Sequence, residues 1–154
     1  MAESMKKIRY KHTNLVAADW DKLAKFYENV FGCIRIPPER HLAGEWLAKG
    51  TGVKNANFSG VHLQLPGYGK NAPTLEIYQY KKNKPKLRSE ANRLGFGHIA
   101  FEVENITGMT AKIIENGGSK IGDIVTSEIN EVGVLTFIYL ADPEGNIIEL
   151  QSWK

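Results

Sequence analysis

Four side chains with metal-binding chemistry recur at matching places in the two halves of this 154-residue sequence. His12 and His98 each lie in a strand-like alternating segment that opens a half, and Glu76 and Glu149 each lie between aliphatic residues in the strand-like segment that closes it. Side chains that are neighbours on a strand point to opposite faces. The aliphatic neighbours are therefore expected to pack against a helix, and both carboxylates to project from the inner face of a sheet.

Two imidazoles and two carboxylates in one partly dry cleft predict a bound cation, because burying two unneutralised negative charges is costly. Two nitrogen and two oxygen ligands suit one divalent ion, Ni²⁺, Co²⁺, Zn²⁺, Fe²⁺ or Mn²⁺, and a six-coordinate ion keeps two positions for water or substrate oxygens. Taken singly, each His is more simply explained as a structural polar residue and each Glu as a solvated one. The metal hypothesis depends on the matched positions of all four.

Hydrophobic periodicity predicts the order strand, helix, strand, strand, strand in each half. This order indicates an α+β fold of two βαβββ modules, at about residues 6–80 and 95–153, joined by a connector at 81–94. The expected elements are a strand of about ten residues from Lys7, a helix capped by Asp19 and ended by Gly32, strands at Cys33–Ile36, Phe58–Leu65, Thr74–Tyr80 and Gly97–Val103, a helix capped by Thr107, and strands at Ile121–Thr126, Val134–Ala141 and Asn146–Trp153. Pro37-Pro38 is expected to end the second strand, with a loop to Asn57.

The connector Lys81–Leu94 is strongly basic, with six Lys or Arg residues against the single acid Glu90. It is either a solvated link between two packed units or an electrostatic rim that attracts an anionic substrate.

Composition excludes several classes of protein. Apolar residues make up 42% and charged residues 24%, as in folded proteins, and the net charge of +3 is too small for a dedicated nucleic-acid binder. No apolar run approaches the ~18 residues of a membrane span. Cys33 is the only cysteine, and Met1–Lys7 is polar where a secretory signal would be apolar, so we expect a cytoplasmic protein.

Five further residues are candidates for binding or covering a substrate. His62 and Gln64 have the alternation expected for the inner face of their strand, Tyr78 has it on the next strand, and Trp46 lies in the predicted loop that could cover a substrate, as does Tyr68 in another loop. Each has a structural alternative, solvation for the polar residues and packing for the aromatic ones.

Five segments together resemble the vicinal oxygen chelate superfamily, which includes glyoxalase I, methylmalonyl-CoA epimerase, extradiol dioxygenases, fosfomycin thiol transferases and bleomycin-binding proteins. The segments are His12-Thr-Asn-Leu-Val, Phe26-Tyr27…Phe31-Gly32, Leu75-Glu76-Ile77, Gly97-His98-Ile99-Ala100-Phe101 and Asp142-Pro143-Glu144-Gly145-Asn146…Ile148-Glu149-Leu150. The resemblance implies paired modules that form a cup-shaped, mostly antiparallel sheet with its helices outside. It also implies the metal-ligand order His12, Glu76, His98, Glu149.

The resemblance to glyoxalase I further implies a metal-dependent lyase or isomerase that moves a proton next to a carbonyl through an enediolate, with Glu149 or Glu76 as the base and a small substrate with adjacent oxygens. Val16 and Tyr80 stand where glutathione-dependent members often have Arg and Asn. The alternatives are a small-molecule binding or antibiotic-resistance protein without turnover, and a ring-cleaving dioxygenase. Because such modules expose sheet edges that can pair between chains, we expect a homodimer with shared clefts.

Overall fold

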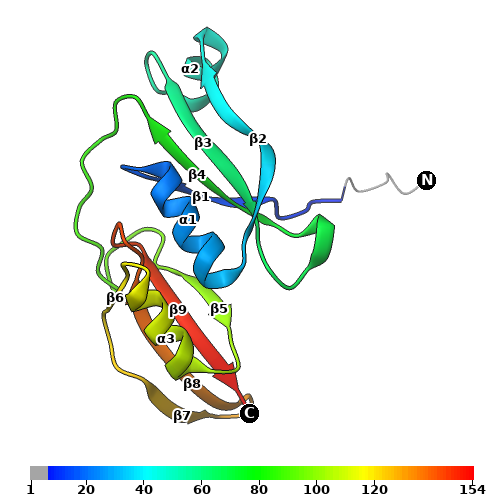
Figure 1. Cartoon of the computed structure of the whole chain (residues 1–154), viewed down its shortest axis with the longest axis vertical. Helices are drawn as coiled ribbons and strands as arrows, with labels where there is room; N and C mark the ends of the chain where they lie inside the picture. Colours follow the sequence, from blue (N-terminus) through cyan, green and yellow to red (C-terminus); the bar gives the residue numbers. More distant parts are fainter. Residues whose placement is uncertain (1–6) are drawn as a thin grey trace.

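The chain folds into two sheets, each covered on one face by a helix (Figure 1). The structure is a computed structural model that describes residues 7–154. Residues 1–6, which include the predicted start of the first module and most of the polar Met1–Lys7 segment, lie outside the described residues. No helix in the described range is long and apolar enough to cross a membrane.

The first sheet, sheet A, has the strand order β1 (His12–Val16), β4 (Thr74–Tyr80), β3 (Asn57–Gln64), β2 (Ile34–Ala43). Sheet B has the order β5 (Ile99–Glu102), β9 (Ile147–Trp153), β8 (Gly133–Ala141), β6 (Ser119–Lys120), and β7 (Val125–Ile129) also pairs with β8. β1 pairs with β4, and β5 with β9, in parallel, while the other pairs are antiparallel. The predicted α+β fold of two modules is confirmed.

The two sheets remain separate within one chain. β1 and β5 each hydrogen-bond to a single strand of their own sheet and lie at its edge. The other backbone edge of each strand is therefore unpaired within the described part of the chain, which leaves it open to a further strand.

Local signals explain where the module helices begin and end. In α1 (Trp20–Phe31), Asp19 accepts a hydrogen bond from the Lys22 amide at 3.1 Å, and Gly32 adopts the left-handed conformation that ends the helix. In α3 (Ile106–Glu115) the predicted cap, Thr107, is wrong. Asn105 caps this helix by accepting from the Gly108 amide at 2.8 Å, which places Thr107 inside the first turn.

Four predicted boundaries are also wrong. The first strand, β1, has five residues and begins at His12 rather than at Lys7. β2 continues through Pro37-Pro38 to Ala43, because it is an edge strand whose pairing with β3 shifts register between Ile36 and Arg40, and prolines are tolerated at such irregularities. The predicted loop after it contains the short helix α2 (Glu45–Thr51), and a 3₁₀ turn (Gly69–Asn71) precedes β4. The strand expected at Ile121–Thr126 is also wrong, because residues 121–124 form a bend between β6, which ends at Lys120, and β7, which begins at Val125.

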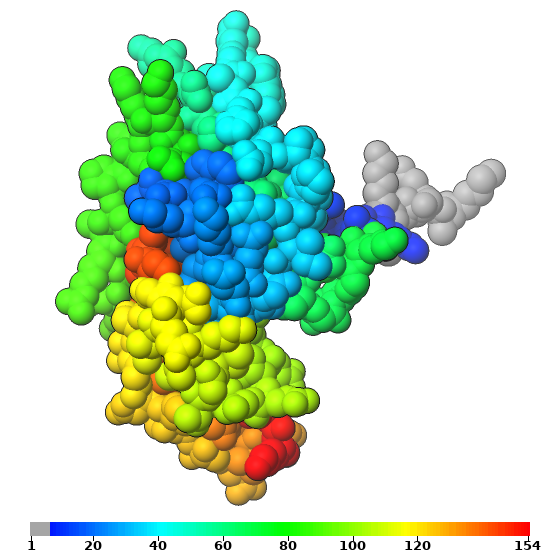
Figure 2. All heavy atoms as spheres, viewed as in Figure 1, coloured from blue at the N-terminus to red at the C-terminus, as the bar shows by residue number. Residues whose placement is uncertain are grey.

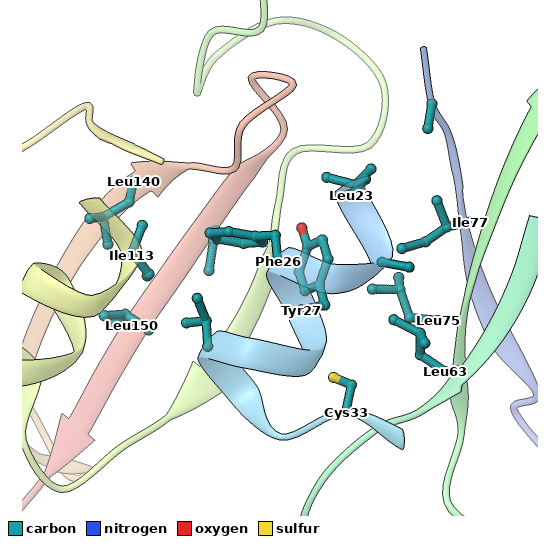
Figure 3. Packing of buried hydrophobic residues seen from close by; sticks show 14 of the residues in the cluster. Leu23, Phe26, Tyr27, Cys33, Leu63, Leu75, Ile77, Ile113, Leu140 and Leu150 are labelled. Atoms are coloured by element: carbon teal, nitrogen blue, oxygen red, sulfur yellow. The ribbon is translucent and has the colours of Figure 1, made fainter. Parts of the chain in front are cut away.

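Both modules share one hydrophobic core, with α1 between the two sheets. Figure 3 shows Phe26 and Tyr27 of α1 between Leu63, Leu75 and Ile77 of sheet A on one side and Ile113, Leu140 and Leu150 of the second module on the other. The rings of Phe31 and Phe101 stack with centroids 3.8 Å apart, and α1 lies directly against α3 (Figure 2). Cys33 belongs to this core, where burial raises its pKa to about 12 and excludes a role as a ready nucleophile.

The turn at residues 142–146 binds the second module to the start of α1. The Tyr27 hydroxyl donates to buried Asp142 at 2.8 Å, and Asp142 also accepts from the backbone amides of Glu144 and Asn146. Glu144 in turn accepts from the backbone amides of Ala18 and Asp19 at 2.6 and 3.1 Å. In Figure 2 this turn, in orange-red, lies beside the blue start of α1. The placement of the modules is thus fixed by polar contacts as well as by the core.

Candidate functional site

The first module brings His12 and Glu76 together on the inner face of sheet A. β1 and β4 run in parallel with Asn14 beside Glu76, and His12 Nε2 lies 3.2 Å from Glu76 Oε1. The Asn14 side-chain amide donates to the same oxygen at 3.2 Å. Glu76 is 7% exposed, so its charge is largely withdrawn from water and depends on these polar neighbours.

His62 and Tyr78 hold the other oxygen of Glu76. His62 Nε2 lies 3.0 Å from Glu76 Oε2, the Tyr78 hydroxyl donates to Oε2 at 3.1 Å, and His62 and Tyr78 are themselves 2.7 Å apart. Burial raises the pKa of Tyr78, with a further contribution from the charge of Glu76, so the phenol keeps its proton. Burial also lowers the pKa of His62, against the opposing effect of Glu76, which favours the neutral imidazole.

The second module brings His98 and Glu149 together on sheet B. His98 Nε2 lies 3.0 Å from Glu149 Oε2, and the His98 ring lies 4.7 Å from that of Tyr139, the residue paired with Glu149 across β8 and β9. His98 is the one side chain in the described residues that contacts the carboxylate of Glu149 by a hydrogen bond or ion pair. Glu76 has four such neighbours, so the two carboxylates are held very differently.

The two His–Glu pairs lie on faces of the sheets that point away from each other. Leu75 and Ile77, on either side of Glu76, are buried in the shared core, and so are Ile148 and Leu150, on either side of Glu149. Since alternate side chains on a strand point to opposite faces, both carboxylates lie on the faces opposite that core. The four predicted ligands are therefore brought together as two pairs, and the pairs do not meet within one chain.

Neither His–Glu pair alone supplies enough ligands for a divalent ion, but the two pairs together do. Within residues 7–154 no group of three or more His, Cys, Asp or Glu side chains is arranged to hold a metal ion. Each pair nevertheless presents an imidazole nitrogen beside a carboxylate oxygen, and two pairs placed together supply the two nitrogen and two oxygen ligands that such ions accept.

The other predicted residues are distributed unevenly around the first pair. Gln64 lies on the inner face opposite Thr74, whose buried Oγ1 has no hydrogen-bond partner in the described part of the chain. Trp46 lies on α2 rather than in a loop, and it is 62% exposed. Tyr68 is exposed beside the 3₁₀ turn.

The sequence reasoning missed an aromatic wall on the inner face of sheet B. Tyr139, Phe137 and Leu135 on β8 pair with Glu149, Gln151 and Trp153 on β9, so all six share one face, and the rings of Phe137 and Tyr139 are 5.7 Å apart. The signal was present in the sequence. The turn at residues 142–146 makes β8 and β9 a hairpin, and counting outward from it places Tyr139 opposite Glu149.

Gly60 is required for the position of Tyr78. A Cβ at residue 60 would lie 2.6 Å from Cδ1 of Tyr78 and closer still to the Ile77 carbonyl oxygen. We expect Gly60→Ala to displace the Tyr78 ring from Glu76 and to lower the free energy of unfolding by about 1–3 kcal/mol in urea titrations. Gly50→Ala, in α2 with open space around it, is the matched control and should leave stability equal or raise it by up to ~1 kcal/mol. Equal stability of the two variants would contradict this role of Gly60.

Comparisons with known proteins agree with the fold and the sequence motifs. The family model described as the Glyoxalase/Bleomycin resistance protein/Dioxygenase superfamily matches residues 9–150. A protein of Synechocystis sp. named probable lactoylglutathione lyase is 27% identical over 142 residues, which cover 90% of this chain and 91% of that protein.

Solved structures share the fold at low sequence identity. A glyoxalase family protein from Bacillus cereus superposes with a TM-score of 0.81 at 20% identity, covering 99% of both chains. One from Enterococcus faecalis superposes with a TM-score of 0.55 at 22% identity, covering 96% of this chain and 98% of its own. The chain belongs to the Glyoxalase/Bleomycin resistance protein/Dioxygenase superfamily. Members of this family include glyoxalase enzymes as well as proteins without catalytic activity.

Proposed function

We propose that this chain is a metal-dependent lyase or isomerase of the glyoxalase type, which transfers a proton between two carbons next to a carbonyl. The observation that carries the proposal is the unequal support of the two carboxylates. Glu76 is held by four polar side chains, and Glu149 by His98 alone among the described residues. The firmly held Glu76 suits a permanent ligand, and the less constrained Glu149 suits a ligand that also takes up and returns a proton.

His12, Glu76, His98 and Glu149 would hold one divalent ion, whose identity among Ni, Co, Zn, Fe and Mn the donor set leaves open. Such an ion supplies Lewis-acid polarisation to a small substrate with two adjacent oxygens. The side chains of Asn14, His62 and Tyr78 keep Glu76 in place. A carboxylate oxygen of Glu149 takes the proton from the carbon next to the carbonyl and returns it to the neighbouring carbon, so that Glu149 ends as it began.

A homodimer is part of the proposal, because the two pairs face away from each other in one chain. Joining the inner face of sheet A in one protomer to that of sheet B in its partner would bring His12 and Glu76 to the partner's His98 and the partner's Glu149. The free edges of β1 and β5 support such a junction, since each can accept a strand. Ile8 and Phe96, shortly before these strands, are fully exposed in the single chain and would be covered. A cytoplasmic location agrees with the single buried cysteine.

The test compares Glu149→Gln with Glu76→Gln in protein loaded with metal. Wild-type protein should exchange the proton next to the carbonyl of a methylglyoxal hemithioacetal, or of an acyl-CoA ester, with solvent deuterium. Glu149→Gln should lower the exchange rate at least ~100-fold while the protein retains part of its bound metal. The main effect of Glu76→Gln should be the loss of bound metal, measured by elemental analysis. Wild-type protein that exchanges neither substrate class would contradict the proposal.

The aromatic wall of Phe137, Tyr139 and Trp153 favours a second candidate, a binding protein that holds a planar ligand without turnover. A thermal-shift screen with and without chelator separates the two functions. Stabilisation by an aromatic antibiotic that persists in chelator supports the binding protein, and ligand stabilisation that requires metal supports the enzyme.

A further inference from the structure

The inner face of sheet A leads from Glu76 along β4 to the end of the sheet that lies near α2 (Figure 1). Tyr78 and Tyr80 follow Glu76 at alternate positions and therefore share its face, and both rings pack against Phe58 on β3, with centroids 4.1 and 5.2 Å from it. Beyond them lies a cavity of about 590 Å³, lined by residues 53–57 and 80–82. An aromatic surface thus connects the candidate site to this cavity.

Three lysines surround the cavity, and none of them has a carboxylate partner among residues 7–154. Lys54 comes from the loop after α2, and Lys81 and Lys82 follow the end of β4. None of the three forms an ion pair with an acid of the described residues, whereas six other Lys or Arg side chains in that range do. Three unpaired cations around one cavity make a positive potential that favours an anion.

Backbone hydrogen bonds hold the two lysine-bearing segments together. The Lys81 amide donates to the Asn57 carbonyl at 2.8 Å, and the Ala56 amide donates to the Val53 carbonyl at 3.1 Å, which closes the turn that contains Lys54. The Asn83 side chain accepts from the Tyr80 amide at 3.0 Å and so shapes the turn that carries Lys81 and Lys82. The three cations are therefore placed around the cavity by the fold, whereas their side chains stay free to adapt.

We propose that the substrate of this site carries a second, remote anionic group, a carboxylate or a phosphate, which Lys54, Lys81 and Lys82 bind at the end of the sheet. This inference rests on the proposed function and specifies its substrate class. Tyr80 lies four steps along the strand from Glu76, so the remote anion lies about 13 Å or more from the reacting carbon. The part of the substrate between the two ends runs over Tyr78 and Tyr80.

A binding experiment tests the cavity without catalysis. Calorimetric titration of metal-free protein at low salt compares two matched pairs of probes, 4′-phosphopantetheine with pantetheine for a phosphate, and glutathione with its glycine monoethyl ester for a carboxylate. We expect the more anionic member of at least one pair to bind roughly tenfold more tightly, and added salt to remove the difference. The pair that shows the preference identifies the anion. Equal affinities within both pairs, or no binding by either acid, overturn the inference.

The variant for this experiment is Lys54→Gln/Lys81→Gln/Lys82→Gln. It should abolish the preference, whereas Lys70→Gln/Lys112→Gln/Lys154→Gln, which removes three exposed lysines remote from the cavity, should retain it. A preference that survives in the first variant overturns the inference.

Hemithioacetals of the same four thiols then extend the comparison to kcat/KM with metal-loaded protein. Turnover of all four at equal kcat/KM overturns the inference and leaves the proposed function standing. Anion binding that depends on the three lysines, without exchange of any substrate proton, contradicts the proposed function instead.

Discussion

Two inactive variants of this protein should restore activity to each other when they are combined. In the proposed dimer each site takes His12 and Glu76 from one protomer and the partner's His98 and the partner's Glu149 from the other. A dimer of one Glu76→Gln chain and one Glu149→Gln chain then has one site with both substitutions and one intact site. Random pairing of equal amounts makes half of the dimers mixed, so about a quarter of wild-type activity should return.

The measurement is the rate of substrate proton exchange after the two variants have been co-expressed or refolded together, with each variant alone as the baseline. Glu149→Gln combined with His98→Ala is the matched control. Both of these substitutions lie in the second module, so every site of that mixture lacks an intact His98–Glu149 pair and no activity should return. Failure of the first mixture to exceed its baseline, with mixed dimers present, would show that the sites are not shared between protomers.

The alternation of residue types was enough to predict the fold and the face on which each candidate ligand lies. Leu75 and Ile77 are in the core and Glu76 on the opposite face because a strand has a period of two, and the same holds for Ile148, Glu149 and Leu150. This period is local, so it can be read from a few consecutive residues. The α+β class and the two modules follow from the same patterns.

The arrangement of the modules could not be predicted in this way. The alternation around Glu76 and Glu149 is the same whether the inner faces of the two sheets meet or point away from each other. What decides between them are contacts between distant residues, such as the stacking of Phe31 on Phe101 and the hydrogen bond from Tyr27 to Asp142. The passage of β2 through Pro37-Pro38 was missed for a related reason, since a proline is tolerated there only because β2 is an edge strand.

Removal of the Asp142 carboxylate should lower the free energy of unfolding more than Gly60→Ala or Tyr27→Phe. Asp142 is 2% exposed and accepts hydrogen bonds from the Tyr27 hydroxyl, the Asn146 side chain and two backbone amides. Asp142→Ala leaves these donors without their acceptor away from water, which should lower the free energy of unfolding by about 3 kcal/mol or more in urea titrations. The exposed Asp123→Ala is the control and should change it by less than ~0.5 kcal/mol. A loss below ~1 kcal/mol for Asp142→Ala would show that the turn does not hold the modules together.

The same contact should make stability depend on pH through Tyr27. Burial, followed by the charge of Asp142, raises the pKa of Tyr27 well above its ordinary value. The unfolded chain releases the phenol proton near pH ~10 while the folded chain keeps it, so this contribution to stability is complete below that pH and is lost as pH rises above it. Tyr27→Phe should cost about 1–2 kcal/mol at pH 7, and it should lose less stability than wild type between pH 9 and 11. Tyr139→Phe, which removes a phenol from the partly exposed inner face of sheet B, serves as the control and should keep most of the wild-type slope. Parallel slopes for wild type and Tyr27→Phe would mean that the Tyr27 hydroxyl ionises in the folded protein as readily as in the unfolded chain.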